Sequence, residues 1–369
     1  MHTIAIAPSA ITSKRRLVVE LARRLRGAGH RVLLLERSAD APDEGFERRV
    51  LDLRPALDIE IGRPRVIAER RVVRAAAATF TPDALAGLLT DVGADLLLVD
   101  IEEHECTIAA LASGIDVPVA VLDSFFGLWP RNGIGPLDSP LPPGTDLRGR
   151  ARVALAWGRS WARMGVSELR RRLSGTRPDR FAVVRELART TGVRRAMTRR
   201  QWLYPFAPRE LPILQLTAAE LDLPHTPPPN VVRVGPLLTR IDTEAIDGIP
   251  DRALVASLDA ARVAERPIVL CVSGAFMSAS DGGFLGRLGQ VAERHPEVLF
   301  VVGTGGSDVP AELAEAPNIH AADWVPQREV LSIADAAIVH SGTGTLHECV
   351  AARVPMVVLP FRVNDQLGN

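Results

Sequence analysis

The alternation of short apolar strands with helical stretches is the feature that most restricts the fold of this chain. The strand Thr3–Ala7 is followed by apolar residues at helical spacing up to Gly29, and Arg31–Glu36 forms the next apolar run. A strand, a helix and a second strand within about thirty residues form a βαβ unit, which requires a parallel sheet. The same alternation of helices and strands occurs at 81–122 and from residue 267 onward. The sequence therefore predicts an α/β protein with parallel sheets.

The length of the chain and one connector predict two domains. The 369 residues are too many for one comfortable core. A stiff proline-rich stretch and a polar connector end near residue 250 and separate the two α/β series. We expect Rossmann-like domains at 1–235 and 251–369, joined by a linker at 236–250. In such a pair ligands bind in the crevice outside the carboxyl ends of the strands.

Composition excludes several classes of protein. Lysine plus arginine and aspartate plus glutamate number 44 each, so the formal net charge is zero and nucleic-acid binding by charge alone is excluded. No apolar run approaches the about 20 residues that cross a bilayer, and the amino terminus does not resemble a signal peptide. The three cysteines lie far apart without metal or disulfide spacing. We therefore expect a cytoplasmic protein.

Basic residues are concentrated in one predicted helical segment. Between Arg148 and Arg200 there are 16 arginines and three acidic residues, which give this stretch a charge of +13. Within it Trp157, Trp161 and Met164 recur on one helical face, and we expect them in the core. The alternatives are the wall of an acceptor pocket or contact with an anionic membrane surface. The charge predicts an anionic partner, with peripheral membrane association as one form of it.

A loop of small residues near the end of the chain connects a strand directly to a helix. Such a loop aims backbone N–H groups and the helix N-terminus at an anion, and a phosphate or diphosphate is the natural ligand. A tight turn without a ligand is the alternative. The loop residues that would bind the anion are His340, Ser341, Gly342, Thr343, Gly344 and Thr345.

The residues around this loop offer partners for the rest of a nucleotide. Glu348 lies one turn into the helix, where its carboxylate could accept the hydroxyls of a ribose. Trp324 offers a flat ring and Gln327 an amide for a base, and Asp365 and Gln366 are two polar side chains downstream. Each residue alone also fits a structural role, as core, solvated helix residue or cap.

Four motifs in order resemble the donor signature of nucleotide-sugar glycosyltransferases with the GT-B fold, of the plant natural-product and bacterial macrolide type. They are Trp-x-Pro-Gln at 324–327, His-Ser-Gly-Thr-Gly-Thr-x-x-Glu at 340–348, Val-Pro-Met-Val-x-x-Pro at 354–360 and Asp-Gln-x-x-Asn at 365–369. The resemblance implies two Rossmann-like domains that face each other across a cleft, the first binding the acceptor. It also implies a hexosyltransferase that takes a UDP- or TDP-sugar and inverts the anomeric centre without a metal or cofactor.

The resemblance also implies a role for each matching residue. Trp324 would stack on the base with Gln327 near it, Glu348 would hold the ribose, and Asp365 and Gln366 would bind sugar hydroxyls. The diphosphate would be bound by the loop after residue 339, and from the other side by Ser273 and Gly274. The acceptor would be a small or lipid-like molecule.

The sequence departs from the family pattern at two places. It ends at Asn369 within the signature, where relatives continue, so we expect an incomplete C-terminal domain. Relatives carry the base that deprotonates the acceptor as a histidine in the first loop, where this chain has its only lysine, Lys14. Asp100 fits the family's partner aspartate, and Glu103 or His104 could replace the base, with Lys14 as a cationic anchor. A solvated acidic turn is the alternative for these residues.

Two other functions remain open from the sequence. A protein of the same fold could bind a nucleotide sugar without catalysis, because the usual base is missing. A nucleotide-sugar epimerase would need no acceptor.

Overall fold

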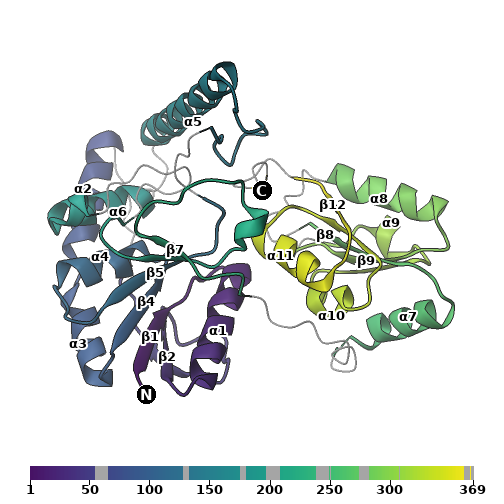
Figure 1. The fold of residues 1–369 in the computed structure, drawn as a ribbon, viewed down its shortest axis with the longest axis horizontal. Coiled ribbons are helices and arrows are strands. Elements are labelled where there is room, and N and C mark those ends of the chain that lie inside the picture. The colour runs from purple at the N-terminus through teal and green to yellow at the C-terminus, as the bar shows by residue number, and fades with distance from the viewer. Residues whose placement is uncertain are drawn as a thin grey trace. The chain divides into compact units, whose positions relative to one another are not determined.

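We analysed a computed structural model of the chain, and it forms two compact units, Met1–Leu237 and Leu238–Asn369 (Figure 1). The structure describes residues 1–54, 65–127, 133–174, 180–196, 208–237, 249, 251–273, 282–306, 308–360 and 366. Each unit is a parallel sheet with helices, so the predicted fold class is confirmed.

The sheet of the first unit has seven strands among the described residues, all parallel, in the order β3-β2-β1-β4-β5-β6-β7. The strands are β1 (Thr3–Ala7), β2 (Arg31–Glu36), β3 (Glu47–Val50), β4 (Leu96–Asp100), β5 (Val119–Asp123), β6 (Ile213–Gln215) and β7 (Val231–Arg233). The predicted strands β1 and β2 have the expected bounds. The short strands β3 and β6 were not predicted, because β3 consists of Glu-Arg-Arg-Val and carries no apolar run.

Helices of the first unit cover both faces of this sheet. They are α1 (Thr12–Gly27), α2 (Arg65–Ala78), α3 (Asp83–Val92), α4 (His104–Ala112), α5 (Leu147–Ser174) and α6 (Arg180–Thr190). Successive residues of β1 point to opposite faces, so Ile4 and Ile6 pack in one core with α1. Ala5 and Ala7 pack in the other core with α3 and α4. Both faces are buried, as an all-parallel sheet requires.

The aromatic residues of the arginine-rich helix α5 divide between core and surface. Trp157 is buried, its indole Nε1 donates to the carbonyl oxygen of Ile134 at 2.9 Å, and its ring lies 5.6 Å from that of Trp161. Trp161 packs against the same core. Met164 is 39% exposed, so the expectation that it is a core residue was wrong. It lies beyond the part of α5 that contacts the sheet.

One stretch, Arg71–Val92, is long and apolar enough to be compared with a membrane span, contrary to the expectation that no run approaches that length. The structure divides it between α2, which ends at Ala78, and α3, which begins at Asp83. Leu85 and Leu89 of this stretch are fully buried in a core of the first unit. These residues therefore serve the interior of an α/β unit.

The second unit repeats the strand order of the first. Its strands are β8 (Ile268–Val272), β9 (Leu299–Gly303), β10 (Ile319–Ala322), β11 (Ala336–Val339) and β12 (Met356–Val358). They pair in parallel in the order β10-β9-β8-β11-β12. The helices are α7 (Arg252–Val263), α8 (Gly282–Arg294), α9 (Ala311–Ala314), α10 (Gln327–Leu331) and α11 (Thr343–Ala352).

Some elements of the second unit were not predicted. They are helix α7, capped by the side chain of Asp251, helix α9 and strand β10. Helix α10 begins at Gln327, directly after Pro326. Proline cannot donate a backbone hydrogen bond, so the residue after it is a natural helix start.

The shared strand order gives each sheet one topological switch point. The first strand of each unit lies between two neighbours, and the chain leaves β1 and β4, or β8 and β11, toward opposite sides of the sheet. The loops after these strands therefore diverge at the carboxyl ends. Open α/β sheets bind ligands at that point. The loops after these four strands are therefore the first places to look for a site.

A buried ion pair links α1 to the carboxyl end of β2. The guanidinium of Arg15 binds both carboxylate oxygens of Glu36 at 2.7 and 2.9 Å, and both side chains are buried. Glu44 accepts a further hydrogen bond from Arg15 at 2.8 Å. The pair fixes the start of α1, which carries Lys14.

We predict that Glu36→Gln lowers the free energy of unfolding by about 3–5 kcal/mol, because it leaves a buried guanidinium without its full charge partner. The control is Glu47→Gln, which removes an exposed partner of Arg31 and should cost less than about 1 kcal/mol. Urea denaturation followed by tryptophan fluorescence measures both, because four of the five tryptophans belong to the first unit. Equal costs for the two variants would contradict the prediction.

Candidate active site

The loops after β8 and β11 lie at the carboxyl edge of the second sheet, where the sequence predicts an anion-binding site. Ser273, directly after β8, is buried, and its hydroxyl donates to the carbonyl oxygen of Gly303 at 3.3 Å. Ser341, after β11, is fully buried with φ of 59°, and its hydroxyl donates to the carbonyl oxygen of Gln366 at 2.6 Å. A left-handed conformation is uncommon outside glycine and marks a loop that its surroundings hold in place.

Gly342 is the N-cap residue of helix α11, and its lack of a side chain allows the His340 ring to approach closely. A β-carbon at this position would lie 2.5 Å from Nε2 of His340. The imidazole therefore lies against the loop itself, at the N-terminus of a ten-residue helix. Thr343 and Thr345 lie in the first turn of that helix. The predicted anion-binding residues thus share one helix start, where the helix dipole favours negative charge.

Two of the predicted nucleotide-binding side chains contact each other. The amide Nε2 of Gln327 donates to Oε2 of Glu348 at 2.5 Å and approaches Oγ1 of Thr345 at 3.4 Å. Helix α10 is thereby joined to α11 at the predicted ribose position. The pair holds the Glu348 carboxylate in one orientation.

Trp324 is 61% exposed, and its indole lies against Gly306 at the carboxyl end of β9. Gly306 has φ of 90°, which favours glycine, and a β-carbon there would contact the indole at 3.7 Å. An exposed indole that packs against a glycine suits stacking on a nucleotide base. Gly274 and Asp365, also predicted for this site, lie outside the described residues.

The loops after β1 and β4 bring together charged groups in the first unit. The Lys14 ammonium lies 2.6 Å from Oε1 of Glu102, and the hydroxyl of Ser9 donates to Oε2 of Glu102 at 2.6 Å. The same ammonium lies 3.5 Å from the ring centroid of Phe125. The backbone N–H of Glu102 donates to Oδ1 of Asp100 at 3.0 Å. Lys14 and Asp100 therefore do lie in one cluster.

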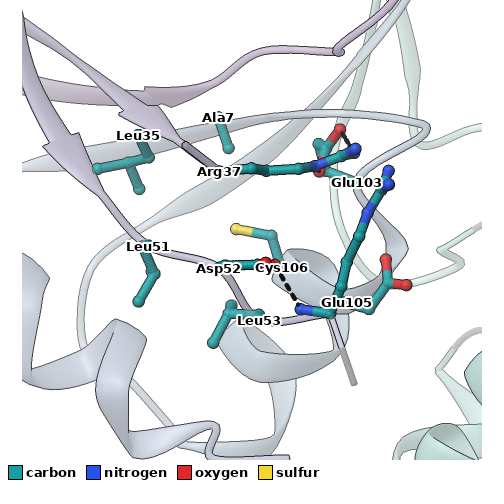
Figure 2. Close-up of a pocket in the computed structure, with 10 residues that line it drawn as sticks. Ala7, Leu35, Arg37, Leu51, Asp52, Leu53, Glu103, Glu105 and Cys106 are labelled. Carbon is teal, nitrogen blue, oxygen red and sulfur yellow. Dashed lines mark hydrogen bonds and ion pairs between the residues drawn. The ribbon is translucent and has the colours of Figure 1, made fainter. Parts of the chain in front are cut away.

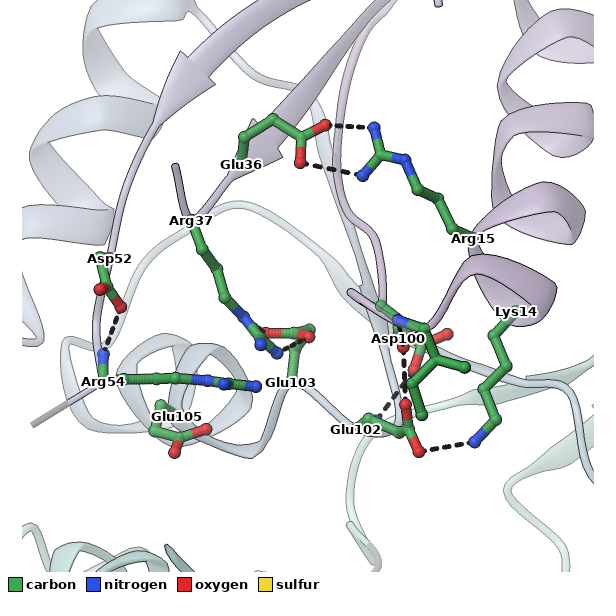
Figure 3. Close-up of polar contacts among 12 residues, drawn as sticks. Lys14, Arg15, Glu36, Arg37, Asp52, Arg54, Asp100, Glu102, Glu103 and Glu105 are labelled. Carbon is green, nitrogen blue, oxygen red and sulfur yellow. Dashed lines mark hydrogen bonds and ion pairs between the residues drawn. The ribbon is translucent and has the colours of Figure 1, made fainter. Parts of the chain in front are cut away.

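Glu103 and His104 point elsewhere. Figure 3 shows Glu102 directed toward Lys14 and Glu103 directed toward Arg37. Arg37 binds both carboxylate oxygens of Glu103. His104 is buried at the start of α4, and its ring packs edge-on against Phe181 with centroids 6.0 Å apart. The structure therefore does not place either predicted base at the surface of the cluster.

Burial governs the protonation of this region. It raises the pKa of Asp100 to about 8, although the Lys14 charge acts in the opposite direction. Burial also raises the pKa of Glu103 to about 7, against the hydrogen bond and charge of Arg37, and that of Asp123 to about 7. It lowers the pKa of His104 to about 4, with Arg180 adding to the effect. His104 is therefore neutral, and Asp100 is largely protonated, near pH 7.

A small pocket lies beside this cluster, at the carboxyl ends of β1 and β2 (Figure 2). It encloses about 330 Å³, its open mouth included. Apolar and charged residues both line it; they are Ala7, Leu35, Arg37, Leu51, Asp52, Leu53, Arg54, Glu103, Glu105 and Cys106. Burial raises the pKa of the Cys106 thiol, so this cysteine is not reactive.

Sequence reasoning missed three residues of this region. Neither Glu102 nor Ser9 was given a role from the sequence, and Arg180 entered only as part of the basic segment. Arg180 binds Glu105 at 2.5 and 2.8 Å and the carbonyl oxygen of Glu102 at 2.9 Å. The signal for Glu102 was its place after β4, which it shares with Glu103.

No group of three histidine, cysteine or acidic residues is arranged to hold a metal ion within the described parts of the chain.

Part of the second unit matches a known protein family. Residues 293–369 match the model of the UDP-glucoronosyl and UDP-glucosyl transferase family. The chain is 32% identical over 136 residues to the elloramycin glycosyltransferase ElmGT of Streptomyces olivaceus, which covers 34% of this chain and 35% of that protein. It is 42% identical over 71 residues to the oleandomycin glycosyltransferase of Streptomyces antibioticus, 19% of this chain and 16% of that protein. The aligned region thus spans about a third or less of either relative.

The fold agrees over the full chain. A crystal structure of the glycosyltransferase of kitacinnamycin matches with a TM-score of 0.62, covering 100% of this chain and 82% of that one at 20% sequence identity. The resemblance to GT-B glycosyltransferases of natural-product type is therefore confirmed.

The raised pKa of Asp100 predicts a pH dependence of stability. Because the folded-state pKa lies above the ordinary value near 3.8, the unfolded chain releases this proton at lower pH than the folded chain does. The stability that protonated Asp100 contributes is full below about pH 4 and is lost as the pH rises to about 8. The lowered pKa of His104 acts in the opposite direction, but only below about pH 6.5.

We therefore expect Asp100→Asn to gain stability relative to the wild type as the pH rises from about 6.5 to about 8, by at most about 1.4 kcal/mol per pH unit. Urea denaturation at a series of pH values measures the difference in free energy of unfolding between the variant and the wild type. Both proteins contain Glu103 and Asp123, so the contributions of these two residues cancel in the difference. A stability difference that is independent of pH in this window would show that Asp100 is already ionised there.

Proposed function

We propose that this protein is an inverting glycosyltransferase that moves a sugar from a UDP- or TDP-sugar to a small-molecule or lipid-like acceptor. The observation that carries the proposal is the arrangement at the β8–β11 switch point. There the His340 to Thr345 loop, the Gln327–Glu348 pair and the exposed Trp324 ring occupy the carboxyl edge of one sheet. The family match over the same residues supports the nucleotide-sugar class of donor.

Each part of this edge suits one part of the donor. The start of α11 offers backbone N–H groups and a dipole to the diphosphate, which becomes the leaving group. The Glu348 carboxylate accepts hydroxyl hydrogens of the ribose, and the Trp324 ring stacks on the base. Ser273 supports the diphosphate from β8, and Gln366, whose backbone is bound by Ser341, lies beside the sugar. Helix dipole and hydrogen-bond donors carry the leaving-group charge in this proposal, without a metal or cofactor.

Donor binding without catalysis is the second candidate. The observation that favours it is Lys14, which occupies the position of the family's base and is held in an ion pair with Glu102. Release of nucleoside diphosphate that depends on an acceptor separates the two functions, because a silent homologue binds the donor and releases nothing.

The proposal includes an anionic partner for helix α5. Leu155, Val166 and Leu169 are exposed, and their spacing of eleven and three residues places them on one helical face. Arg152 and Arg159 are exposed on the same helix, whereas Arg163 binds Asp138 at 2.7 Å. An apolar stripe flanked by arginine suits the surface of an anionic membrane, and a protein so bound would be cytoplasmic and membrane-associated.

For the donor site, we predict that Glu348→Ala weakens binding of UDP or TDP by about 1–3 kcal/mol, because the ribose hydroxyls lose their acceptor. His340→Ala should weaken nucleotide binding or slow transfer. Titration calorimetry on the full chain measures the affinities. Glu297→Ala, at the opposite edge of the same sheet and exposed, is the control and should leave them unchanged. If Glu348→Ala and His340→Ala both bind nucleotide and turn over like the wild type, the donor site lies elsewhere.

For helix α5, we predict that the chain sediments with phosphatidylglycerol vesicles at about 0.1 M salt and is released at about 1 M, because salt screens the attraction. Arg152→Gln with Arg159→Gln should weaken sedimentation. Arg252→Gln with Arg262→Gln, on helix α7, is the matched control. Absence of sedimentation at both salt concentrations would contradict an anionic membrane as the partner.

A further inference from the structure

Only one residue between Leu97 and Ala110 is not buried, and it is Glu102. Its side chain is 12% exposed, whereas Asp100, Glu103 and His104 are all buried. A group that takes a proton from a bound substrate must come within hydrogen-bond reach of it. Within this run the carboxylate of Glu102 is therefore the one that a substrate can reach.

Lys14 and Ser9 both bind this carboxylate. Lys14 Nζ lies 2.6 Å from Oε1, and Ser9 Oγ donates to Oε2 at 2.6 Å. The same Ser9 oxygen accepts from the backbone N–H of Ile11 at 3.1 Å, which orients the hydroxyl toward Glu102. Glu102 N donates to Asp100, which fixes the backbone below the carboxylate. The arrangement joins the loop after β1 to the loop after β4 at the switch point of the first unit.

The ion pair sets the electrostatic surroundings of Glu102. The Lys14 ammonium at 2.6 Å favours the carboxylate form, which accepts hydrogen bonds. Asp100 is buried and mostly protonated, and Glu103 is neutralised by Arg37, so neither competes for Lys14 as a fully charged group. The sole lysine of the chain thus pairs with a carboxylate of the candidate site that is only partly buried.

We propose that Glu102 is the base that takes the proton of the acceptor hydroxyl, and that Lys14 is its positioning residue. The inference rests on the proposed transferase function. The acceptor oxygen forms a bond to the anomeric carbon as the bond from that carbon to the diphosphate oxygen breaks, and the electron pair leaves with the nucleoside diphosphate. The acceptor proton passes to the Glu102 carboxylate, which later returns it to solvent.

A paired carboxylate is basic enough for this step. As the new bond to carbon forms, the acceptor oxygen becomes positive and its proton strongly acidic, so transfer to a carboxylate is downhill late in the reaction. Lys14 suits the positioning role because its ammonium contacts both the Glu102 carboxylate, at 2.6 Å, and the Phe125 ring, at 3.5 Å from the centroid.

The test compares acceptors of different acidity. Transfer from UDP-glucose and TDP-glucose is measured on the full chain at about pH 8 with 4-nitrophenol, which is ionised there, and with benzyl alcohol, which is not. Glu102→Gln should lower kcat with benzyl alcohol by about 10²–10⁴-fold, the usual contribution of a general base. It should change kcat with 4-nitrophenol by less than about threefold, because no proton remains to be removed. Nucleotide affinity should not change.

Controls separate a base from a structural role. Glu47→Gln, a carboxylate paired with Arg31 at the amino-terminal edge of the same sheet, should match the wild type with both acceptors. Lys14→Met should lower the benzyl alcohol rate, and adding it to Glu102→Gln should cause no further loss, because it acts through Glu102. Glu102→Asp serves if the glutamine variant does not fold. The aspartate side chain is one methylene shorter, which draws the carboxylate back, so this variant should slow only the transfer to benzyl alcohol.

Two results would overturn the assignment. Equal losses with both acceptors would make Glu102 a structural residue, and no loss with benzyl alcohol would place the base elsewhere. A third result is distinct: a wild-type chain that binds nucleotide but transfers to no acceptor overturns the transferase proposal itself, and this assignment with it.

Discussion

Parallel pairing on both sides of the first strand is the constraint on which each unit depends. β1 pairs with β2 and β4, and β8 with β9 and β11, so the connecting helices must cover opposite faces. The two loops that follow the central paired strands then start side by side at the carboxyl edge of the sheet. This is how Lys14 reaches Glu102, which lies 88 residues further along the chain. The same geometry brings the loop of Ser273 beside the loop of His340.

The loop after β4 shows how a short acidic run is distributed among different environments. Glu102 pairs with Lys14, Glu103 with Arg37 and Glu105 with Arg180, each cation coming from a different element. Burial alone would raise the pKa of Glu105, but the hydrogen bond and charge of Arg180 lower it. Among the described residues no arginine pairs with Asp100, and burial raises its pKa to about 8, so it retains its proton. A buried acid must be paired or neutral, and Glu102, the member of the run that is not fully buried, is paired with Lys14.

Much of this fold could be predicted because apolar runs report burial directly. β1, β2 and β11 have the bounds that their hydrophobic patterns indicate. β3, a strand of charged residues at the sheet edge, has no such pattern and depends on pairing with β2. The donor edge was recognisable because its small residues and glutamate are close in sequence. The sequence could not show which of Glu102 and Glu103 is available as a base. That depends on the positions of Lys14 and Arg37, which lie 88 and 66 residues away from them along the chain.

The scarcity of lysine has a practical consequence. Arginine supplies every other basic side chain, and Lys14 is only 15% exposed. Reagents that acylate primary amines therefore have two targets on the whole chain, the amino terminus and a residue of the candidate site. Acylation of Lys14, read by mass spectrometry, becomes a footprint of that site, with the amino terminus as the internal standard. A ligand that covers the β1–β4 edge would protect one amine and leave the other reactive.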